Sequence, residues 1–592
     1  MKRKITILFS LLLLSVLLAA CSGPDQHIWL KTPDWSRAAF LGNTVVNDPP
    51  PMAQDADGNL YFVLFSNLPE EDQMMPTVVA RDGNGAPLWT KSLEAYSLHR
   101  PDEPQLIWDG DHLQLFWLED DSLYMLTLDQ DANPVGEPLR LSAEITVGSF
   151  SVSVDANARH TLWFAGPRDD PGVYALTSLD GNGEILPIDP EGSRIQLRYD
   201  QENTLHALWL QYPLGYGRTQ ILYGVYPAVS NPTSISPTSL YELVVGPSNG
   251  LEGPVLGIDN DTAYIFWTVI VRSGLEAGAV QTSYMHFPLE AVAQISAPDS
   301  IVVPADYNLE FEAAPNASLQ TGGRAILANT QGFRTNELEE FVPNTQQSGE
   351  LALIFRSSTQ HLWRKMKDQI NVVYFDKGQT TSYQPLSFTT TLSTSPNLYN
   401  DAAGYLYATW LEKIDSQSYA TYFASTSPQI EATLSKSSGR EVGRVVAQTA
   451  FGMLVGVLLA PIAAGVLAIA PLVVIFLLGP LRKLGSNRVQ DFFSLVTIAL
   501  AILSVWAGKF AVFPGMLDYV PFSAWIPEIP VLLGNIMRYA VPLFGSALAI
   551  FVAWFYTYRQ SNKSTLYFSL IYVGVDSVFT AAIYAVLIYG AI

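Results

Sequence analysis

The chain has one cysteine among 592 residues, and charged residues make up only 15% of it. A lone cysteine excludes a disulfide scaffold and a zinc site built on several thiolates. Basic residues are scarce: 33 Lys and Arg stand against 55 Asp and Glu, for a net charge of −22. This balance excludes a basic nucleic-acid binder. The 48% hydrophobic content in turn excludes a disordered chain.

The amino terminus has the pattern of an export signal. Three bases at positions 2–4 precede the apolar run Ile5–Leu18, and small residues follow it. The tetrapeptide Leu18-Ala-Ala-Cys21 resembles the bacterial lipobox, and this resemblance implies that Cys21 becomes the lipidated first residue of the mature chain. An uncleaved signal anchor is the alternative. Both interpretations export the residues that follow.

The carboxyl-terminal part of the chain is rich in long apolar stretches. Between Arg444 and Arg482 lie 37 residues without a charge. A bilayer core of about 30 Å needs about 20 helical residues, so each stretch is long enough to cross. Two short spans joined as a hairpin would also fit the first stretch. We predict four spans, at about 455–480, 492–513, 531–557 and 565–590.

The distribution of bases between these stretches favours one first span over a hairpin. With a single span, the bases of two loops face the cytoplasm, and the loop 514–530, which carries Asp518 and Glu528 and no base, faces outward. A hairpin would place every loop on the opposite side of the membrane, against the rule that bases face the cytoplasm. The bases concerned are Arg482, Lys483, Arg488, Arg559 and Lys563. We therefore expect a multi-pass protein of the cytoplasmic membrane, with its large amino-terminal region on the extracytoplasmic side.

Three charged residues fall inside the predicted spans: Lys509, Arg538 and Asp576. Ionisable groups inside a membrane are costly, so they are functional candidates by default. Two antiparallel neighbouring helices could bring Arg538 and Asp576 within reach of each other. A structural ion pair and a proton or ion site both remain open.

The exported middle of the chain contains an internal repeat. Residues 22–440 carry 50 acidic and 22 basic residues, so all the net negative charge lies there. An Asp, a polar turn and an aromatic-rich alternating strand recur, with steps of 54, 46, 45 and 59 residues between the first five copies. The copies begin at Asp55, Asp109, Asp155, Asp200, Asp259 and Asp401.

A second turn signal within several copies indicates four short strands per unit. Such sheets bury both faces when they pack around an axis, which predicts an all-β propeller of about seven four-stranded blades, with six or eight also open. Paired β-sandwiches are the competing fold. The predicted division is a signal peptide at 1–21, a linker at 22–47, the propeller at 48–430, a juxtamembrane linker at 431–446 and a four-helix α-helical transmembrane domain at 447–592.

Two segments resemble known propeller families. Ser153-Val-Asp155-Ala-Asn157 resembles the Asp box of sialidases, and Asp82-Gly-Asn-Gly-Ala-Pro-Leu-Trp89 resembles the blade end of quinoproteins. The resemblance extends over about 380 residues, and it implies a propeller without choosing between these families. A sialidase-type site would use clustered arginines to hold a carboxylate. The arginines available are Arg159, Arg194, Arg198 and Arg218.

The repeat Asp residues are better read as turn caps than as metal ligands. Pairs such as Asp55/Asp57 could begin a calcium loop, but none continues to a Glu at the twelfth position. The seven histidines show no pair at metal-ligand spacing. We therefore predict no metal and no cofactor. Tryptophans that recur at equivalent positions are predicted to be inter-blade core: Trp117, Trp163, Trp209, Trp267 and Trp410.

These observations favour a membrane-anchored binding or assembly module, whose propeller recognises a protein, peptide or glycan outside the cytoplasm. Catalysis is less favoured. An exported glycoside hydrolase is one alternative and needs two carboxylates facing each other across the propeller centre. A small transporter or sensor unit coupled to the propeller is another. The bilayer is the expected lipid partner, and no nucleic-acid partner is expected.

Overall fold

The computed structural model describes most of the chain from residue 34 to residue 589. The residues left undescribed are 1–33, 69–72, 156–158, 180–182, 213–216, 227–235, 247, 276, 306–324, 327–333, 345–349, 363–364, 388, 390, 436–438, 479, 481–486, 514–515, 518–520, 522–530, 560–563 and 590–592. The predicted signal peptide and Cys21 therefore lie outside the described residues.

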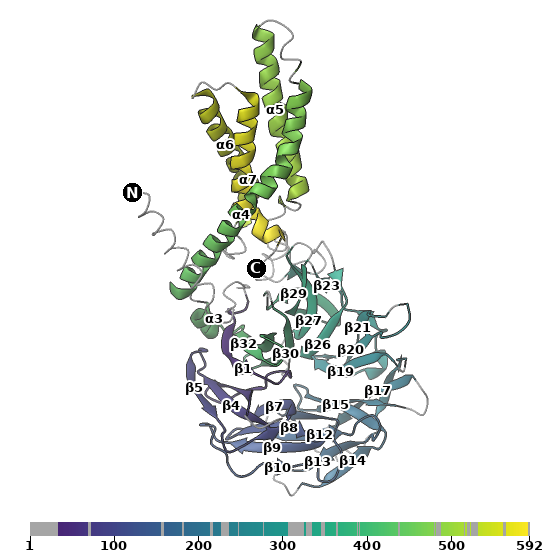
Figure 1. The fold of residues 1–592 in the computed structure, drawn as a ribbon. Helices are drawn as coiled ribbons and strands as arrows, with labels where there is room; N and C mark the ends of the chain where they lie inside the picture. The colour runs from purple at the N-terminus through teal and green to yellow at the C-terminus, as the bar shows by residue number, and fades with distance from the viewer. Residues whose placement is uncertain are drawn as a thin grey trace.

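Seven antiparallel sheets form a seven-bladed β-propeller, with four strands along each blade (Figure 1). Blade 1 comprises β2 (Met52–Gln54), β3 (Leu60–Asn67), β4 (Gln73–Arg81) and β5 (Pro87–Ser92), and blade 2 comprises β7 (Asp102–Trp108), β8 (Leu113–Glu119), β9 (Ser122–Leu128) and β10 (Leu139–Arg140). Blade 3 comprises β11 (Ser149–Val154), β12 (His160–Ala165), β13 (Val173–Leu176) and β14 (Ile185–Asp189). Blade 4 comprises β15 (Gly192–Tyr199), β16 (Leu205–Gln211), β17 (Arg218–Tyr226) and β18 (Thr238–Val244).

Blades 5 to 7 complete the ring. Blade 5 comprises β19 (Gly250–Ile258), β20 (Thr262–Ile270), β21 (Val280–Pro288) and β22 (Asp299–Ser300). Blade 6 comprises β26 (Leu338–Pro343), β27 (Leu351–Leu362), β28 (Lys365–Asp376) and β29 (Gln379–Pro385), with β24 (Ala325–Ile326) paired to β29. Blade 7 comprises β30 (Ser393–Asn400), β31 (Leu406–Lys413), β32 (Tyr419–Ser425) and β1 (Ala39–Thr44). Two short additions are β6 (Leu98–His99), which pairs with β4, and the pair β23 (Val303–Pro304) and β25 (Arg334–Thr335).

Each repeat Asp begins the turn between the first and second strands of a blade. In blade 1, Asp55 Oδ1 accepts the backbone N–H groups of Asp57 at 2.9 Å and Asn59 at 2.8 Å. Its Oδ2 accepts the hydroxyl of Tyr61 from the second strand at 2.9 Å. The same second-strand position supplies Gln114, His206, Tyr264 and Tyr407 to the Asp residues of other blades. The Asp residues are thus turn caps that also tie the turn to the strand, as the sequence predicts.

The inter-blade cores are aromatic. The tryptophans at Trp117, Trp163, Trp209, Trp267 and Trp410 are each at most 4% exposed. Trp163 and Trp209 both belong to the core between blades 3 and 4, which confirms their prediction as packing residues. Every blade therefore presents one apolar face to each neighbour.

The ring closes between the two ends of the propeller sequence. β1 pairs antiparallel with β32 and forms the outer strand of blade 7. Trp35, just before β1, is 1% exposed and donates its indole N–H to Tyr374 of blade 6 at 3.2 Å. The prediction of a linker over 22–47 is therefore wrong for its second half. Local spacing does not reveal this strand, because β1 is short and its partner lies about 380 residues later in the chain.

A short helix leads from the propeller toward the membrane domain. Helix α3 (Pro428–Leu434) follows β32, and its Ile430 is fully buried in a core shared with Leu41, Leu60 and Phe423. Ile430 also lies against Gly85, in the turn between β4 and β5. Because part of the predicted 431–446 linker belongs to α3 and part to the next helix, which starts at Gly439, that segment is largely helical.

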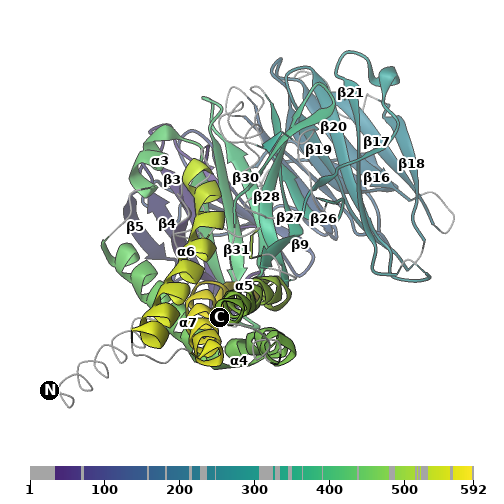
Figure 2. The ribbon, with the colours of Figure 1, turned by 90° about the horizontal axis from the view of Figure 1, so that it is seen from above.

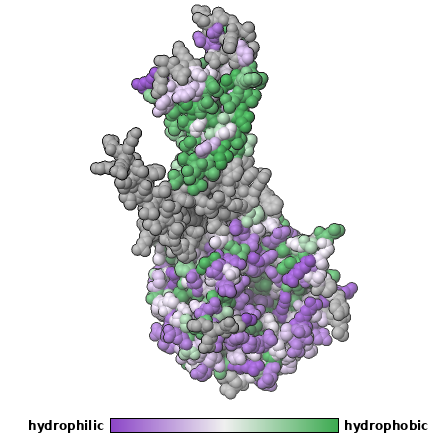
Figure 3. Space-filling view, viewed as in Figure 1, coloured by the Kyte–Doolittle hydropathy of each residue, from purple (hydrophilic) through white to green (hydrophobic). Residues whose placement is uncertain are grey.

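Four long apolar helices form the rest of the chain: α4 (Gly439–Leu478), α5 (Asn487–Val512), α6 (Val531–Tyr558) and α7 (Thr565–Tyr589). All four have segments long and apolar enough to cross a membrane. α4 is one continuous helix through Pro461 and Pro471, so the first apolar stretch forms a single helix and not a hairpin of two. Figure 2 shows the four helices clustered beside the propeller, and Figure 3 shows hydrophobic side chains covering them.

Replacing Trp35 with alanine tests the closure of the ring. We expect Trp35→Ala to lower the free energy of unfolding of the propeller by about 3–5 kcal/mol, because the change empties a buried site between blades 6 and 7. The measurement is chemical denaturation followed by far-ultraviolet circular dichroism. Leu88→Ala on β5, where the side chain is 49% exposed, is the control and should change stability by much less. Equal effects of the two substitutions would contradict the closure argument.

Candidate functional site

The innermost strands of five blades share one irregularity near their first residues. β7, β15, β19, β26 and β30 each contain a shift in register against the second strand, which marks a β-bulge. One residue in each bulge has a positive φ. These residues are Glu103 (50°), Arg194 (54°), Gly253 (80°), Glu340 (52°) and Ser395 (50°).

Four of these five positions carry side chains that the backbone does not favour there. Residues other than glycine rarely adopt a positive φ, and each such residue costs on the order of 1–3 kcal/mol. Three of the four side chains, those of Glu103, Arg194 and Glu340, bear charges. Strain of this kind persists only where the surrounding structure holds it, and here it recurs at one level of the repeat and places charged groups there.

The bulges meet around the propeller axis. Among the inner strands, β15 contacts β19, β19 contacts β26, and β26 contacts β30. In blade 1, Asp48 occupies the corresponding place, since the Glu103 backbone N–H donates to its Oδ2 at 3.1 Å. We call Asp48, Glu103, Arg194, Gly253, Glu340 and Ser395 the axial ring.

Hydrogen bonds join the blades at this ring. From blade 4, Arg194 Nη1 donates to the carbonyl oxygens of Leu251 at 2.6 Å and Gly253 at 2.8 Å in blade 5. The Glu340 N–H of blade 6 donates to Glu252 Oε2 of blade 5 at 3.3 Å. These bonds give the bulges a direct structural role in holding neighbouring blades in register.

The remaining junctions close the ring through blade 7. Glu340 Oε2 accepts the backbone N–H of Ser395 at 2.6 Å and the hydroxyl of Thr394 at 2.8 Å. The Ser395 hydroxyl then donates to the carbonyl oxygen of Asn47 in blade 1 at 2.7 Å. Between blades 3 and 4, the Leu197 N–H donates to the Ser151 hydroxyl at 3.0 Å.

The axial ring and the Asp turns lie at opposite ends of the inner strands. In β15, for example, Arg194 is the third residue, and Asp200 follows the last residue. Helix α3 contacts the turn at Gly85, which in turn lies beside the Asp55 turn, because Gly83 approaches Gly58. The helix that leads to the membrane domain therefore packs at the Asp-turn end, and the axial ring lies at the other end.

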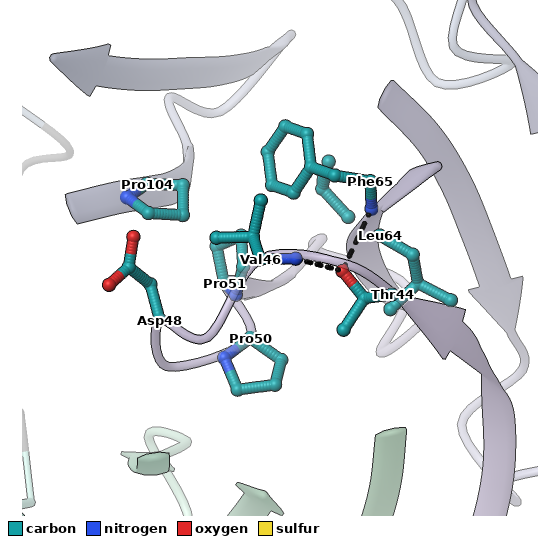
Figure 4. Close-up of a pocket in the computed structure, with 9 residues that line it drawn as sticks. Thr44, Val46, Asp48, Pro50, Pro51, Leu64, Phe65 and Pro104 are labelled. Atoms are coloured by element: carbon teal, nitrogen blue, oxygen red, sulfur yellow. Dashed lines mark hydrogen bonds between the residues drawn. The ribbon is translucent and has the colours of Figure 1, made fainter. Parts of the chain in front are cut away.

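A pocket lies beside Asp48 (Figure 4). Its walls are mainly apolar, and Figure 4 shows the Asp48 carboxylate reaching across it toward Pro104, the neighbour of Glu103. The lining residues are Thr44, Val46, Asp48, Pro50, Pro51, Val63, Leu64, Phe65 and Pro104. The site therefore combines an apolar niche with one carboxylate at its edge.

Two carboxyl groups of the ring are hard to ionise. Burial, followed by the adjacent Asp102 carboxylate, raises the pKa of Asp48 to about 7. Burial, followed by the charges of Asp102 and Asp48, also raises the pKa of Glu103 to about 7, against opposing contributions from the Phe150 N–H and Arg194. Glu103 is nonetheless an exposed residue of β7, so water screens much of this effect.

A second group of charges lies on the blade 6 side. Arg356 on β27 pairs with Glu339 and with Glu340, the latter at 3.3 Å, and lies 3.5 Å from Asp368. Burial raises the pKa of Glu339 and of Glu252, and Arg356 opposes the rise in both. Acids outnumber bases around the axis, so the ring favours a positively charged partner.

The four arginines singled out in the sequence do not form one cluster. Arg194 belongs to the axial ring, and Arg198 lies farther along β15, where burial lowers its pKa to about 10. Arg159 and Arg218 are 72% and 69% exposed and pair with Asp155 and Glu242. No carboxylate-binding arginine group forms among these four residues, so the sialidase-type arrangement is not supported.

In the membrane domain, the structure pairs Asp576 with Lys509 and not with Arg538. Lys509 Nζ lies 2.7 Å from Asp576 Oδ1, and both side chains have no exposed surface. Arg538 lies eight residues before Ser546, the α6 residue that contacts Asp576, which is about 12 Å along the helix. Within the described residues, its Nε and Nη2 atoms have no hydrogen-bond partner.

No motif in the sequence marks Asp48, Glu103, Glu340 or Ser395 as site residues. One usable signal was present: a proline directly follows the positive-φ residue at Pro104, Pro254 and Pro396. Proline near the start of a strand marks an edge or a bulge. The bulges themselves depend on pairing between strands, which the spacing of hydrophobic residues does not reveal.

Comparisons with known proteins identify no family. No protein-family model matches the chain, and no curated protein sequence matches it. Among solved structures, the propeller resembles a polysaccharide lyase described as an ulvan lyase, with 9% identity over 68% of this chain and 100% of that one and a TM-score of 0.39. It also resembles the β-propeller domain of the trilobed protease from Pyrococcus furiosus, with 7% identity, 66% and 100% coverage and a TM-score of 0.34.

A third likeness is to an α-L-arabinanase from Penicillium chrysogenum, with 9% identity over 45% of this chain and 78% of that one and a TM-score of 0.28. At such identities the likeness concerns the fold alone. The site has to be argued from the residues of this chain.

Asp48→Asn tests the raised pKa of Asp48. A carboxyl group whose pKa is higher in the folded state than in the unfolded chain destabilises the fold increasingly as the pH rises from about 4 to about 7. Asparagine removes this cost and keeps an acceptor for the Glu103 N–H. We expect the variant to raise the melting temperature of the propeller more at pH 8 than at pH 5, measured by thermal unfolding.

Asp169→Asn, at an exposed position between β12 and β13, is the matched control, and its effect should not follow this pattern. An Asp48→Asn effect of the same size at both pH values would show that Asp48 ionises as easily in the fold as in the unfolded chain.

Proposed function

We propose that this protein is a membrane-anchored binding module outside the cytoplasm, and that its axial ring binds a basic side chain of an exported peptide or protein. The observation that carries the proposal is the combination at blade 1: an apolar pocket with the Asp48 carboxylate at its edge and Glu103 beside it. The strained bulges place charged groups around the same axis.

The chemistry of the pocket suits a lysine or arginine side chain. Such a side chain has an apolar stem and a charged end, and it buries the stem while the end meets an anion. The pocket itself is about 10 Å³, which is room for about one water molecule, so the stem would lie over its mouth and Asp48 would receive the charge. A bound cation would also lower the pKa of Asp48 and Glu103, so binding should remove a proton from the ring near neutral pH.

The overall charge supports the same class of ligand. Residues 22–440 carry 50 acidic and 22 basic residues, and an excess of one sign raises the association rate of oppositely charged partners. This long-range attraction is screened by salt, so binding should weaken as ionic strength increases.

The membrane anchor fits a propeller that lies outside the cytoplasm. The bases beside the apolar helices favour the propeller on the extracytoplasmic side. α3 packs at the Asp-turn end of the propeller, which leaves the axial ring at the end far from that helix. A lipid on Cys21 would add a second anchor.

A glycoside-cleaving enzyme is the second candidate. Its support is the pKa of about 7 for Asp48 and Glu103, because a carboxyl group protonated near neutral pH can act as a general acid. Such an enzyme needs a second carboxylate across the sugar, and Glu340 of blade 6 is the ring residue that could supply it.

Fluorescence anisotropy with labelled peptides tests the proposal. The full chain, in detergent or lipid discs, should bind a lysine-rich peptide more tightly than a peptide of the same sequence with glutamine in place of lysine. Asp48→Asn combined with Glu103→Gln should weaken binding of the lysine peptide by about tenfold or more, since a charge-assisted contact is worth about 1.5–3 kcal/mol. Binding should also be stronger at pH 8 than at pH 5.5.

Asp169→Asn is again the matched control and should leave the affinity unchanged. Equal affinity for the lysine and glutamine peptides, or binding that survives the double substitution, would refute the proposal. Cleavage of a polysaccharide by the wild type that is lost in the double variant would instead identify the enzyme.

A further inference from the structure

Helix α7 is the central helix of the membrane domain. It contacts α4, α5 and α6, and 56% of its most apolar segment is buried inside the protein, against 17% for α4. The helix nonetheless carries polar side chains on its buried surface. A central helix with buried polar groups is unusual in a bundle whose neighbours are otherwise apolar.

The polar groups meet at Asp576. Its Oδ1 accepts a hydrogen bond from Lys509 Nζ of α5 at 2.7 Å and from Ser546 Oγ of α6 at 2.8 Å. Lys509 Nζ also donates to Ser546 Oγ at 2.9 Å. The three side chains are at most 3% exposed, so three helices share one enclosed polar site.

One oxygen of this site is left unsatisfied. Both donors reach Oδ1, and Asp576 Oδ2, which has no exposed surface, has no partner among the described residues. A buried carboxylate oxygen without a donor carries its full desolvation cost. If the cluster only locked the helices together, both oxygens would be expected to have donors.

Hydroxyl groups continue the polar surface along α7. Ser569 and Tyr572 precede Asp576 by about two turns and one turn, and Ser577 and Thr580 follow it. All four are at most 3% exposed, and the hydroxyls of Ser569 and Ser577 also lack partners within the described chain. Such hydroxyls can rotate to donate or accept, which is what a proton needs to reach an enclosed carboxylate.

The charges that face this site are few on every helix packed against it. α5 contributes Lys509, α7 contributes Asp576, and α4 has no charged residue from Val445 to Leu478. On α6 the charged residue is Arg538, about 12 Å along the helix from Ser546. Lys509 already supplies a positive charge, which would repel a metal cation from this site. A proton, in contrast, adds to Oδ2 as a covalent O–H bond.

We propose that Asp576 is a proton-binding site of the membrane domain, with Lys509 and Ser546 as the residues that position its carboxyl group. Proton uptake forms one O–H bond at Oδ2 and cancels the carboxylate charge. Lys509 keeps its bonds to Ser546 Oγ and to Oδ1, now a carbonyl oxygen. Uptake therefore weakens the electrostatic attraction that joins α5 to α7, which couples protonation to helix packing.

Infrared difference spectroscopy of the full chain in lipid vesicles tests this proposal. Changing the buffer from alkaline to acidic should produce a carboxylic acid carbonyl band that shifts in heavy water. Asp576→Asn should remove that band. Asp491→Asn, at an exposed position in the first turns of α5, is the matched control and should retain it.

Two further variants keep Asp576 and keep the test valid if Asp576→Asn does not fold. Lys509→Gln should raise the pH at which the band appears by at least one unit, because the nearby positive charge is removed. Ser546→Ala should move the band, because Oδ1 loses a donor. Identical spectra for the wild type and Asp576→Asn, or no shift in either of the other variants, would overturn the proposal and leave a purely structural ion pair.

Discussion

Closure of the propeller is the constraint on which the rest of the structure depends. Seven sheets bury their faces only against one another, so the ring is stable when the first and last blades are joined. β1 makes this join by pairing with β32, and Trp35 extends it to Tyr374 of blade 6. The outer strand of the last blade thus comes from the other end of the propeller sequence, and a single cooperative unit results.

The same closure brings the axial ring together. Glu103, Arg194 and Glu340 are far apart in the chain, and each lies at the same level of its own inner strand. Their hydrogen bonds bridge blades, so the strain of a positive φ is offset by inter-blade contacts such as Ser395 to Glu340. A site built this way is held by the ring, and burial, followed by the charge of neighbouring acids, raises the pKa of Asp48 and Glu103.

The membrane domain is built from apolar helices whose few polar side chains face its interior. Its helices present apolar surface on the outside, and their few polar groups turn inward, where Lys509, Ser546 and Asp576 share one site. α3 connects the two parts by burying Ile430 in the core of blades 7 and 1. The two parts of the chain therefore hold two distinct polar centres, one at the propeller axis and one within the helices.

The sequence by itself determined the repeat, the four apolar helices and the roles of the recurring Asp and Trp residues, because these depend on local spacing and on contacts that repeat in every blade. It also marked Lys509, Arg538 and Asp576, since charges stand out in apolar helices. Only the tertiary structure decided that β1 closes the ring, that Lys509 and not Arg538 meets Asp576, and that Glu103 and Glu340 face one axis. These outcomes depend on strand register and helix level, and both are set by partners distant in the chain.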